Sequence, residues 1–236
     1  MALSDLVERF SAAGGCFVTP VEELTHKLEQ CRAIVFDWDG VFNAGRKGQS
    51  SSSGFSEADS MGTNMLRYGL WRRLGQLPYA AIISGENNES AIAFAEREHL
   101  TAVFTGMRDK KQVITHICDN DNLQPEQIAC VFDDINDLPM AAECGLRFRV
   151  HRKASPMFAE FADRREFCDY VTGANSDSFA VREICELMLG LMGSYTDVVA
   201  SRVARDARYE DYFTIRQAVV TRLYGQEEET IVRREN

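Results

Sequence analysis

Four short apolar runs, each leading into a polar cluster, restrict the folds that are open to this chain of 236 residues. They cover residues 34–36, 80–83, 101–104 and 129–132. Runs of this kind are too short for helices and are typical of strands buried on both faces of a parallel sheet. The carboxyl ends of parallel strands lie at one edge, where open α/β sheets bind ligands. The pattern therefore predicts an α/β fold in which the four polar clusters meet.

The first run ends in two carboxylates, Asp37 and Asp39, followed directly by Gly40. Two acids beyond a buried strand, beside a glycine that lets the chain turn away, are suited to hold a cation or to supply a nucleophile. Asp and Gly are also ordinary turn residues, so an acidic turn is the alternative interpretation. The later runs favour chemistry, because they lead to a hydroxyl, a lysine pair and an acid cluster. These are Ser84, then Lys110 and Lys111, then Asp133, Asp134 and Asp137.

In this order the motifs resemble those of the haloacid dehalogenase-like superfamily of aspartate-nucleophile phosphatases. The resemblance rests on DxDGV from Asp37, on Ile-Ile-Ser-Gly ending at Gly85, on the acid cluster continued to Met140, and on the segment 180–187. Within the superfamily the chain is most similar to the small, nearly capless phosphatases of 3-deoxy-D-manno-octulosonate 8-phosphate. The resemblance implies a Rossmann-like parallel sheet flanked by helices, with a minimal cap. The residue pattern on either side of the resemblance predicts extra N- and C-terminal helices.

The resemblance also implies roles in a phosphoryl transfer through an aspartyl phosphate. Asp37 is the expected nucleophile, and Asp39 would protonate the leaving alcohol and then activate water. Because the acid pair alone would repel a phosphate, a cation is expected, and Mg²⁺ suits carboxylate and phosphate oxygens. The assignments are: catalytic, Asp37, Asp39, Ser84 and Lys110; metal-binding, Asp37, Asp133 and the backbone carbonyl of Asp39; holding water or the lysine, Asp134 and Asp137; substrate-binding, Gly85 and Asp59.

Two of these assignments have alternatives in the sequence. Ser84 precedes a helix through residues 91–95, so it could cap this helix as well as bind phosphate at its N-terminus. Either Lys110 or Lys111 could stabilise charge on the transferring group. We expect Lys110 to do so, because Ile114 and Ile117 follow it at the four- and seven-residue spacing of a buried helix face.

Length and composition agree with a small enzyme, and the resemblance implies a small-molecule phosphate ester as its substrate. The net charge of −10 argues against general affinity for nucleic acid, and the basic segment 147–153 is expected to be a strand with its exit loop. Seven scattered cysteines without a CxxC pair indicate a reducing compartment. No apolar run approaches membrane-spanning length, and the start lacks a secretory pattern. We therefore expect a cytoplasmic protein without nucleic-acid or membrane partners.

Outside the central region the sequence indicates helical extensions. The expected boundaries are an N-terminal extension over 1–30, a catalytic domain over 31–193 and a C-terminal extension over 194–236. Within the catalytic domain, residues 43–58 read as a short, polar flap or loop rich in glycine and serine. The similar phosphatases use a longer flap to close a neighbour's site in a tetramer. A homo-oligomer, either a dimer or a tetramer, is therefore a state that the sequence leaves open.

Both extensions carry local predictions. Thr19 is the expected N-cap of a helix that runs from Pro20 to about Glu29. The C-terminal extension is expected to form a helical pair, packed on the domain or on a second subunit. Residues 227–229 and 233–236 are expected to be a solvated tail.

Departures from the similar phosphatases fall on the substrate side of the pocket. Their arginine-aspartate-glycine element corresponds to residues 58–60 and lacks its arginine here, and their glycine-rich loop corresponds to 175–179. The sequence therefore predicts a phosphatase for a small sugar acid or similar metabolite without naming the compound. Two other classes fit less well. A receiver-like phospho-aspartate signalling module places its acids on separate strands, and an idle scaffold that binds a partner through its terminal helices would not need every catalytic residue type.

Overall fold

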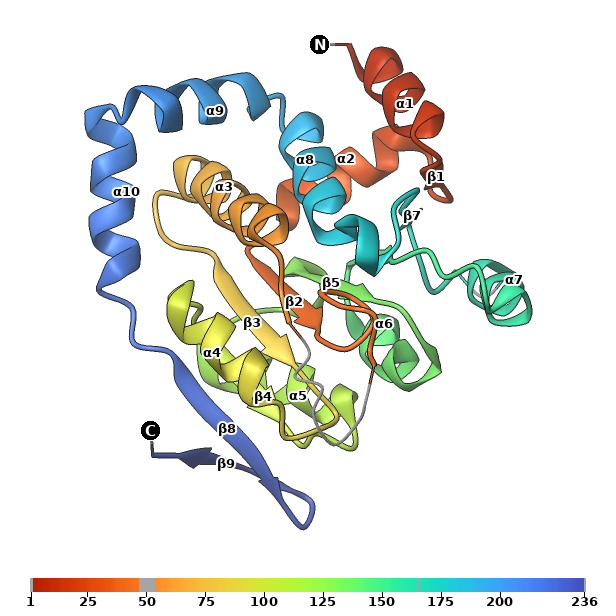
Figure 1. Ribbon diagram of the computed structural model, residues 1–236, viewed down its shortest axis with the longest axis vertical. Coiled ribbons are helices and arrows are strands. Elements are labelled where there is room, and N and C mark those ends of the chain that lie inside the picture. The colour runs from red at the N-terminus through yellow and green to blue at the C-terminus, as the bar shows by residue number, and fades with distance from the viewer. Residues whose placement is uncertain (1, 47–53, 165, 236) are drawn as a thin grey trace.

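One mixed sheet organises the computed structural model, which describes residues 2–46, 54–164 and 166–235 (Figure 1). In spatial order the nine strands of these residues are β1, β7, β6, β5, β2, β3, β4, β8 and β9. Their bounds are β1 Cys16–Phe17, β2 Ala33–Asp37, β3 Tyr79–Ile83, β4 Ala102–Thr105, β5 Ile128–Phe132, β6 Leu146–Arg149, β7 Tyr170–Val171, β8 Arg222–Glu227 and β9 Thr230–Arg234. Pairing is parallel except in the outer pairs β1–β7 and β8–β9. The predicted α/β parallel sheet is confirmed, with an antiparallel strand added at each edge.

The four apolar runs of the sequence form the centre of this sheet. They are β5, β2, β3 and β4, which lie side by side in that order. Asp37 pairs with Ile83 across β2 and β3, and Phe36 pairs with Val131 across β2 and β5. Every residue of these four strands is buried. The polar residues that follow the strands therefore meet at one edge, as the sequence predicts.

Helices cover both faces of the sheet, so that alternate strand residues enter two different cores. Ile34 and Phe36 of β2 share a core with residues of α2, α3, α4 and α8. Ala33 and Val35 pack with residues of α5, α6 and α7 on the other face. The bounds are α1 Leu3–Ala12, α2 Val21–Gln30, α3 Glu57–Leu74, α4 Glu89–Arg97, α5 Lys110–Asp121, α6 Leu138–Glu143, α7 Pro156–Arg164, α8 Ala180–Leu191, α9 Tyr195–Ala204 and α10 Ala207–Gln217, with the 3-10 helices η1 Pro125–Gln127, η2 Ile135–Asp137 and η3 Ser176–Ser178.

The start of α2 differs from the prediction. The helix begins at Val21 with Pro20 as its N-cap, and no side chain caps it. Thr19 instead donates a hydrogen bond of 2.7 Å from its hydroxyl to Asp169. The N-cap prediction for Thr19 was wrong because a buried carboxylate from a distant part of the chain attracts the hydroxyl more strongly than the local helix end does.

The C-terminal segment is partly as expected. The predicted helical pair is present as α9 and α10, which pack on α3. Residues 227–229 and 233–235 are exposed as predicted, but they do not form a tail, because β8 pairs in parallel with β4 and β9 returns antiparallel to it. Tyr224 of β8 stacks on Phe104 of β4 with ring centroids 4.7 Å apart. Glu228 and Glu229 form the turn of this hairpin, after Glu227 ends β8.

The state of the cysteines agrees with the sequence. All seven cysteines are free thiols, and Cys130, Cys144 and Cys185 are buried in the cores as predicted.

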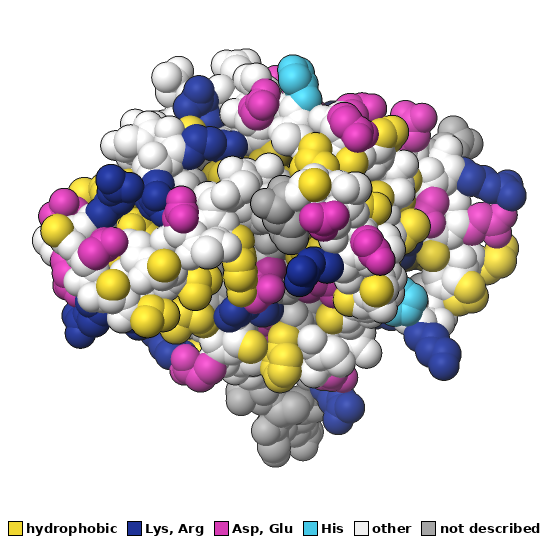
Figure 2. All heavy atoms as spheres, turned by 90° about the horizontal axis from the view of Figure 1, so that it is seen from above, with side chains coloured by type: hydrophobic (Ala, Val, Ile, Leu, Met, Phe, Trp, Pro, Cys, Tyr) yellow, Lys and Arg dark blue, Asp and Glu magenta, His cyan; other side chains and the backbone are white. Residues whose placement is uncertain are grey.

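In the part of the chain that the structure describes, no helix has both the length and the apolar character needed to cross a bilayer. Figure 2 shows one face, seen from above, with acidic and basic side chains interspersed among apolar ones rather than collected by sign.

Candidate active site

A cavity of about 420 Å³ opens where the central strands end. Among the described residues, its lining includes six acidic side chains: Asp37, Asp39, Glu86, Asp133, Asp134 and Asp137. The lining also includes Gly85, Lys110 and the two arginines Arg108 and Arg152. The polar clusters after β2, β3, β4 and β5 thus contribute to one cavity.

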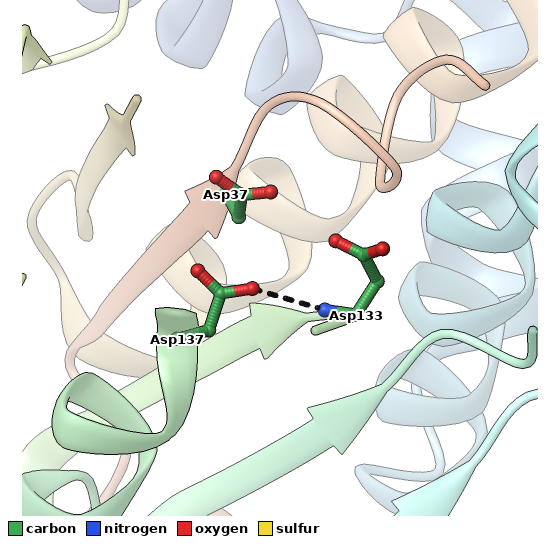
Figure 3. Close-up of side chains that lie close together, drawn as sticks. All are labelled: Asp37, Asp133 and Asp137. Atoms are coloured by element: carbon green, nitrogen blue, oxygen red, sulfur yellow. Dashed lines mark hydrogen bonds between the residues drawn. The ribbon is translucent and has the colours of Figure 1, made fainter. Parts of the chain in front are cut away.

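Three aspartates form the centre of this cavity (Figure 3). Asp37 is the last residue of β2, Asp133 follows β5, and Asp137 ends η2. One carboxylate oxygen from each lies within 4.8 Å of the others, and all three residues are buried. The backbone N–H groups of Asp133 and Asp134 donate to Oδ2 of Asp137 at 3.3 and 3.2 Å, which fixes that side chain.

Lys110 contacts two of the three aspartates. As the first residue of α5 it is buried, and its Nζ donates to Oδ1 of both Asp37 and Asp137. Its neighbour Lys111 is exposed and pairs with Glu143 at 2.7 Å. Of the two lysines that the sequence offers, the structure therefore brings Lys110 to the aspartates and turns Lys111 away.

The cluster carries more negative charge than its own cations balance. Burial raises the pKa of Asp37 to about 7, with Asp137 adding to the effect and Lys110 opposing it. Burial also raises the pKa of Asp133 to about 8, helped by Asp37 and Asp137 and opposed by Arg152. For Lys110, burial lowers the pKa, but the two neighbouring carboxylates outweigh it and the net shift is upward. These shifts show a site that favours binding a further cation or a proton.

Gly40 permits the close approach of the β2 and β5 loops. Its φ of +97° lies in the region that side-chain-bearing residues rarely adopt. A Cβ at this position would collide with the carboxylate of Asp133 and with Arg152. Arg152, which comes from the loop after β6, forms an ion pair with Asp133 and approaches Asp134 at 3.5 Å.

Asn88 joins two predicted catalytic residues and was not foreseen. Its Nδ2 donates to Oδ2 of Asp39 at 2.9 Å and to Oγ of Ser84 at 2.7 Å. The polar sequence that follows Gly85 was the available signal. Ser84 caps no helix, since α4 begins at Glu89 with Asn88 as its N-cap. The capping alternative for Ser84 was therefore wrong.

Other predicted residues lie apart from the cavity or act differently within it. Asp59 is buried in α3, where its carboxylate accepts from the Ser56 hydroxyl at 2.7 Å and from the Arg182 backbone N–H at 2.9 Å. The structure therefore gives no support to its expected substrate contact, because its oxygens already tie α3 to α8. Asp134 accepts from the Ile135 backbone N–H at 2.8 Å and caps η2 rather than holding Lys110.

The two loops expected on the substrate side contribute little to the described cavity. Residues 175–179 do not line it. Within the predicted flap over 43–58, Ala44 and Gly45 line the cavity, and Glu57 and Ala58 already belong to α3. Residues 47–53, which include most of the serine-rich run, lie outside the described residues.

Comparison with known proteins gives a consistent class. No family model matches the sequence. The 3-deoxy-D-manno-octulosonate 8-phosphate phosphatase of Yersinia pestis is 26% identical over 179 residues, which are 74% of this chain and 88% of that protein. The structure of a probable YrbI family phosphatase from Pseudomonas syringae pv. phaseolica matches with a TM-score of 0.63 and 28% identity, covering 79% of this chain and 99% of that one.

A third match shares the fold and was solved with ligands. It is the 3-deoxy-D-manno-octulosonate 8-phosphate phosphatase of Moraxella catarrhalis in complex with magnesium ion, phosphate ion and KDO, at a TM-score of 0.63 and 23% identity, covering 76% of this chain and 98% of that one. In fold and motif order the chain is similar to haloacid dehalogenase-like phosphatases, which are hydrolases of phosphoric monoesters. Within that class, the relatives are octulosonate 8-phosphate phosphatases, so the resemblance predicted from the motifs is confirmed.

Proposed function

We propose that this chain is a Mg²⁺-dependent phosphomonoesterase that forms an aspartyl phosphate and acts on a small sugar acid or a related phosphorylated metabolite. The observation that carries the proposal is the convergence of three buried aspartates with Lys110 at the end of the central strands. The named substrate of the relatives, 3-deoxy-D-manno-octulosonate 8-phosphate, supports the sugar-acid class.

The donor set fits Mg²⁺, a hard cation that prefers oxygen ligands and commonly uses one or two carboxylates. We assign Asp37 and Asp133 as its carboxylate ligands, with the backbone carbonyl of Asp39 as a third. Asp137 is already engaged by Lys110 and by two backbone N–H groups, so we assign it to hold the lysine. When bound, the ion supplies positive charge beside the phosphate oxygens.

The proposed reaction has two steps. In the first, a carboxylate oxygen of Asp37 forms a bond to phosphorus while the ester P–O bond breaks, and Asp39 gives its proton to the leaving oxygen. In the second, Asp39 takes a proton from water as the water oxygen attacks phosphorus, and the bond between Asp37 and phosphorus breaks. Lys110 neutralises charge on the transferred group, and Ser84 with the nearby amides holds its oxygens.

The test is phosphate release from p-nitrophenyl phosphate by the purified protein. We expect turnover with Mg²⁺, loss of turnover after exhaustive chelation, and loss in Asp37→Asn even with Mg²⁺, because no other group replaces the nucleophile. Asp119→Asn, on the exposed side of α5, is the matched control and should keep normal turnover. Full activity after chelation, or near-normal rates in Asp37→Asn, would contradict the proposal.

Three further predictions accompany this function. We propose that the chain divides at about residues 30 and 193 into a catalytic domain with two extensions, that it works in the cytoplasm on a small molecule, and that it forms a dimer or tetramer. Sedimentation equilibrium of the purified protein measures the last of these directly.

A further inference from the structure

Arg108 differs from the other cations of the catalytic cavity. Three cationic side chains line the described part of the cavity: Arg108, Lys110 and Arg152. Lys110 is bound to two carboxylates, and Arg152 is paired with Asp133. The exposed guanidinium of Arg108 makes no hydrogen bond or ion pair with any residue that the structure describes. It is therefore free to meet an anion that enters the cavity.

The backbone of Arg108 is held in place although its side chain is not. Just before it, the Met107 backbone N–H donates to the Ser84 carbonyl at 3.0 Å. The Arg108 backbone N–H donates to Oε1 of Gln226 at 2.8 Å. Gln226 belongs to β8, and its own Nε2 donates to the Glu228 carbonyl at 3.1 Å. The C-terminal hairpin thus fixes the loop that carries Arg108 against the cavity.

Position along the chain separates Arg108 from the groups that handle the reacting phosphate. Lys110 is buried against Asp37, whereas Arg108 lies two residues earlier and is exposed at the cavity lining. A substrate with its phosphate at Asp37 would bring its distal end to the outer part of the cavity. An arginine there recognises carboxylate or phosphate oxygens through two parallel N–H donors.

We propose that Arg108 is a specificity-determining residue that binds a second anionic group of the substrate, a carboxylate or a second phosphate, and that Gln226 positions it. The inference rests on the proposed phosphatase function for the placement of the first phosphate. It assigns to the β8–β9 hairpin a part in substrate selection, although the hairpin supplies no catalytic group.

The test compares compounds that differ only in the distal group. They are glucitol 6-phosphate, which ends in a neutral hydroxymethyl group, 6-phosphogluconate, which ends in a carboxylate, and glucitol 1,6-bisphosphate. Each is titrated calorimetrically with Mg²⁺ into the Asp37→Asn protein, so that binding is measured without turnover. We expect at least one of the two anionic compounds to bind about tenfold more tightly than the neutral one, as for a charge-assisted hydrogen bond. When Arg108→Gln is added to the Asp37→Asn protein, the ratio of the affinity for an anionic compound to that for the neutral one should fall to about one. The affinity for glucitol 6-phosphate should change by less than about threefold.

Matched variants distinguish a specific contact made by Arg108 from a general effect of positive charge on substrate affinity. Lys111→Gln removes one positive charge from the same loop-to-helix segment but outside the cavity, and should leave the affinity ratio unchanged. Gln226→Met removes the acceptor for the Arg108 N–H and should reduce the ratio severalfold, whereas Gln226→Glu keeps an acceptor and should retain most of it. Which of the carboxylate and the phosphate shows the larger preference identifies the second group.

Several outcomes would overturn the proposal. One is an equal loss of affinity for all three compounds in Arg108→Gln, and another is the absence of any preference for a distal anion when Arg108 is present. A ratio that persists in Arg108→Gln would assign the selection to another residue. Failure of the intact protein to hydrolyse p-nitrophenyl phosphate would count against the phosphatase function, whereas the calorimetric ratios measure the role of Arg108 independently.

Discussion

Two buried aspartates of this protein, Asp133 and Asp169, have opposite surroundings. Asp133 is 2% exposed and Asp169 is fully buried, so burial alone does not distinguish them. Asp169 accepts hydrogen bonds from the Thr19 hydroxyl at 2.7 Å, from Lys27 Nζ at 2.6 Å, and from both the backbone and the guanidinium of Arg147. Burial would raise the pKa of Asp169, but these donors outweigh it and the pKa falls below its usual value.

Asp133 lies in the candidate active site among other acids, with Arg152 as its cationic partner. Its pKa rises to about 8 because burial, Asp37 and Asp137 together outweigh that arginine. From this contrast we infer that Asp169, surrounded by hydrogen-bond donors, serves the fold, whereas Asp133, with an excess of neighbouring carboxylates, is suited to bind a ligand. The two carboxylates differ in how many hydrogen-bond donors and how many other carboxylates surround them.

The largest expected effect is on stability, and it follows from removal of the fully hydrogen-bonded carboxylate of Asp169. Asp169→Ala leaves Arg147 and Lys27 without their partner, and we expect it to lower the free energy of unfolding by about 3–5 kcal/mol. Glu160→Ala removes an exposed ion pair with Arg164 and should cost less than about 1 kcal/mol. Urea denaturation of both variants measures the difference. Similar small losses of unfolding free energy in both would show that the hydrogen-bonded carboxylate of Asp169 contributes no more to stability than an exposed ion pair.

The next effect concerns catalysis. Asp39→Asn should slow hydrolysis of an alkyl phosphate by about a hundredfold, because the leaving alcohol then lacks a proton donor. With p-nitrophenyl phosphate, whose leaving group needs little protonation, the loss should be smaller. Rates from single-turnover experiments on both substrates test this, and equal losses on the two would exclude the general-acid assignment of Asp39.

A third effect is the dependence of stability on pH without metal. The pKa values of Asp37 and Asp133 in the folded protein, about 7 and about 8, lie above the usual 3.8. The folded state therefore binds these protons more tightly, and its stability decreases as pH rises from about 4 to about 8. The lowered pKa of Asp169 acts in the other direction, since its contribution is present above the usual pKa and is lost as pH falls below it.

At the proposed metal site Mg²⁺ would compete with the protons on Asp37 and Asp133, so it should raise the melting temperature more at pH 8 than at pH 5. Asp133→Asn should reduce both the pH dependence and the effect of Mg²⁺. Thermal melts at the two pH values, with and without Mg²⁺, measure these differences. A stabilisation by Mg²⁺ that is independent of pH would contradict the raised pKa values.

The smallest effect concerns Asn88, which orients Asp39 and Ser84 without being assigned a chemical step. Asn88→Ala removes two hydrogen bonds of ordinary length and should lower kcat by about fivefold to tenfold. Because the change acts through Asp39, it should be larger for an alkyl phosphate than for p-nitrophenyl phosphate. Equal effects on the two substrates would show that Asn88 acts on something other than the orientation of Asp39.

The sequence predicted the centre of the molecule better than its periphery. Strands β2, β3, β4 and β5 were predictable because burial on both faces makes each of them an uninterrupted apolar run, which few other structures produce. Asp37, Asp133 and Lys110 followed from the positions where such runs end. Their meeting is a consequence of parallel strand topology rather than of any local signal.

Two wrong predictions, the N-cap at Thr19 and the C-terminal tail, share a physical cause, which is contact with residues far along the chain. Thr19 had a sound local pattern for an N-cap, but Asp169, 150 residues away, takes its hydroxyl. The substrate-binding role of Asp59 stays a prediction, and its motif match gave no sign that the Arg182 backbone N–H donates to its carboxylate. Residues 227–229 and 233–236 were predicted to be a tail because β-pairing at the edge of a sheet leaves polar side chains exposed, as a tail would.

The C-terminal hairpin also has a consequence for association. The β4 strand has the sequence Ala-Val-Phe-Thr, and β8 covers its otherwise open hydrogen-bonding groups. The outermost strand is then β9, which carries exposed Arg233 and Arg234. Charged side chains on an edge strand discourage the edge-to-edge pairing that leads to aggregates. By replacing an apolar edge with a charged one, the hairpin favours a protein that stays dispersed at high concentration.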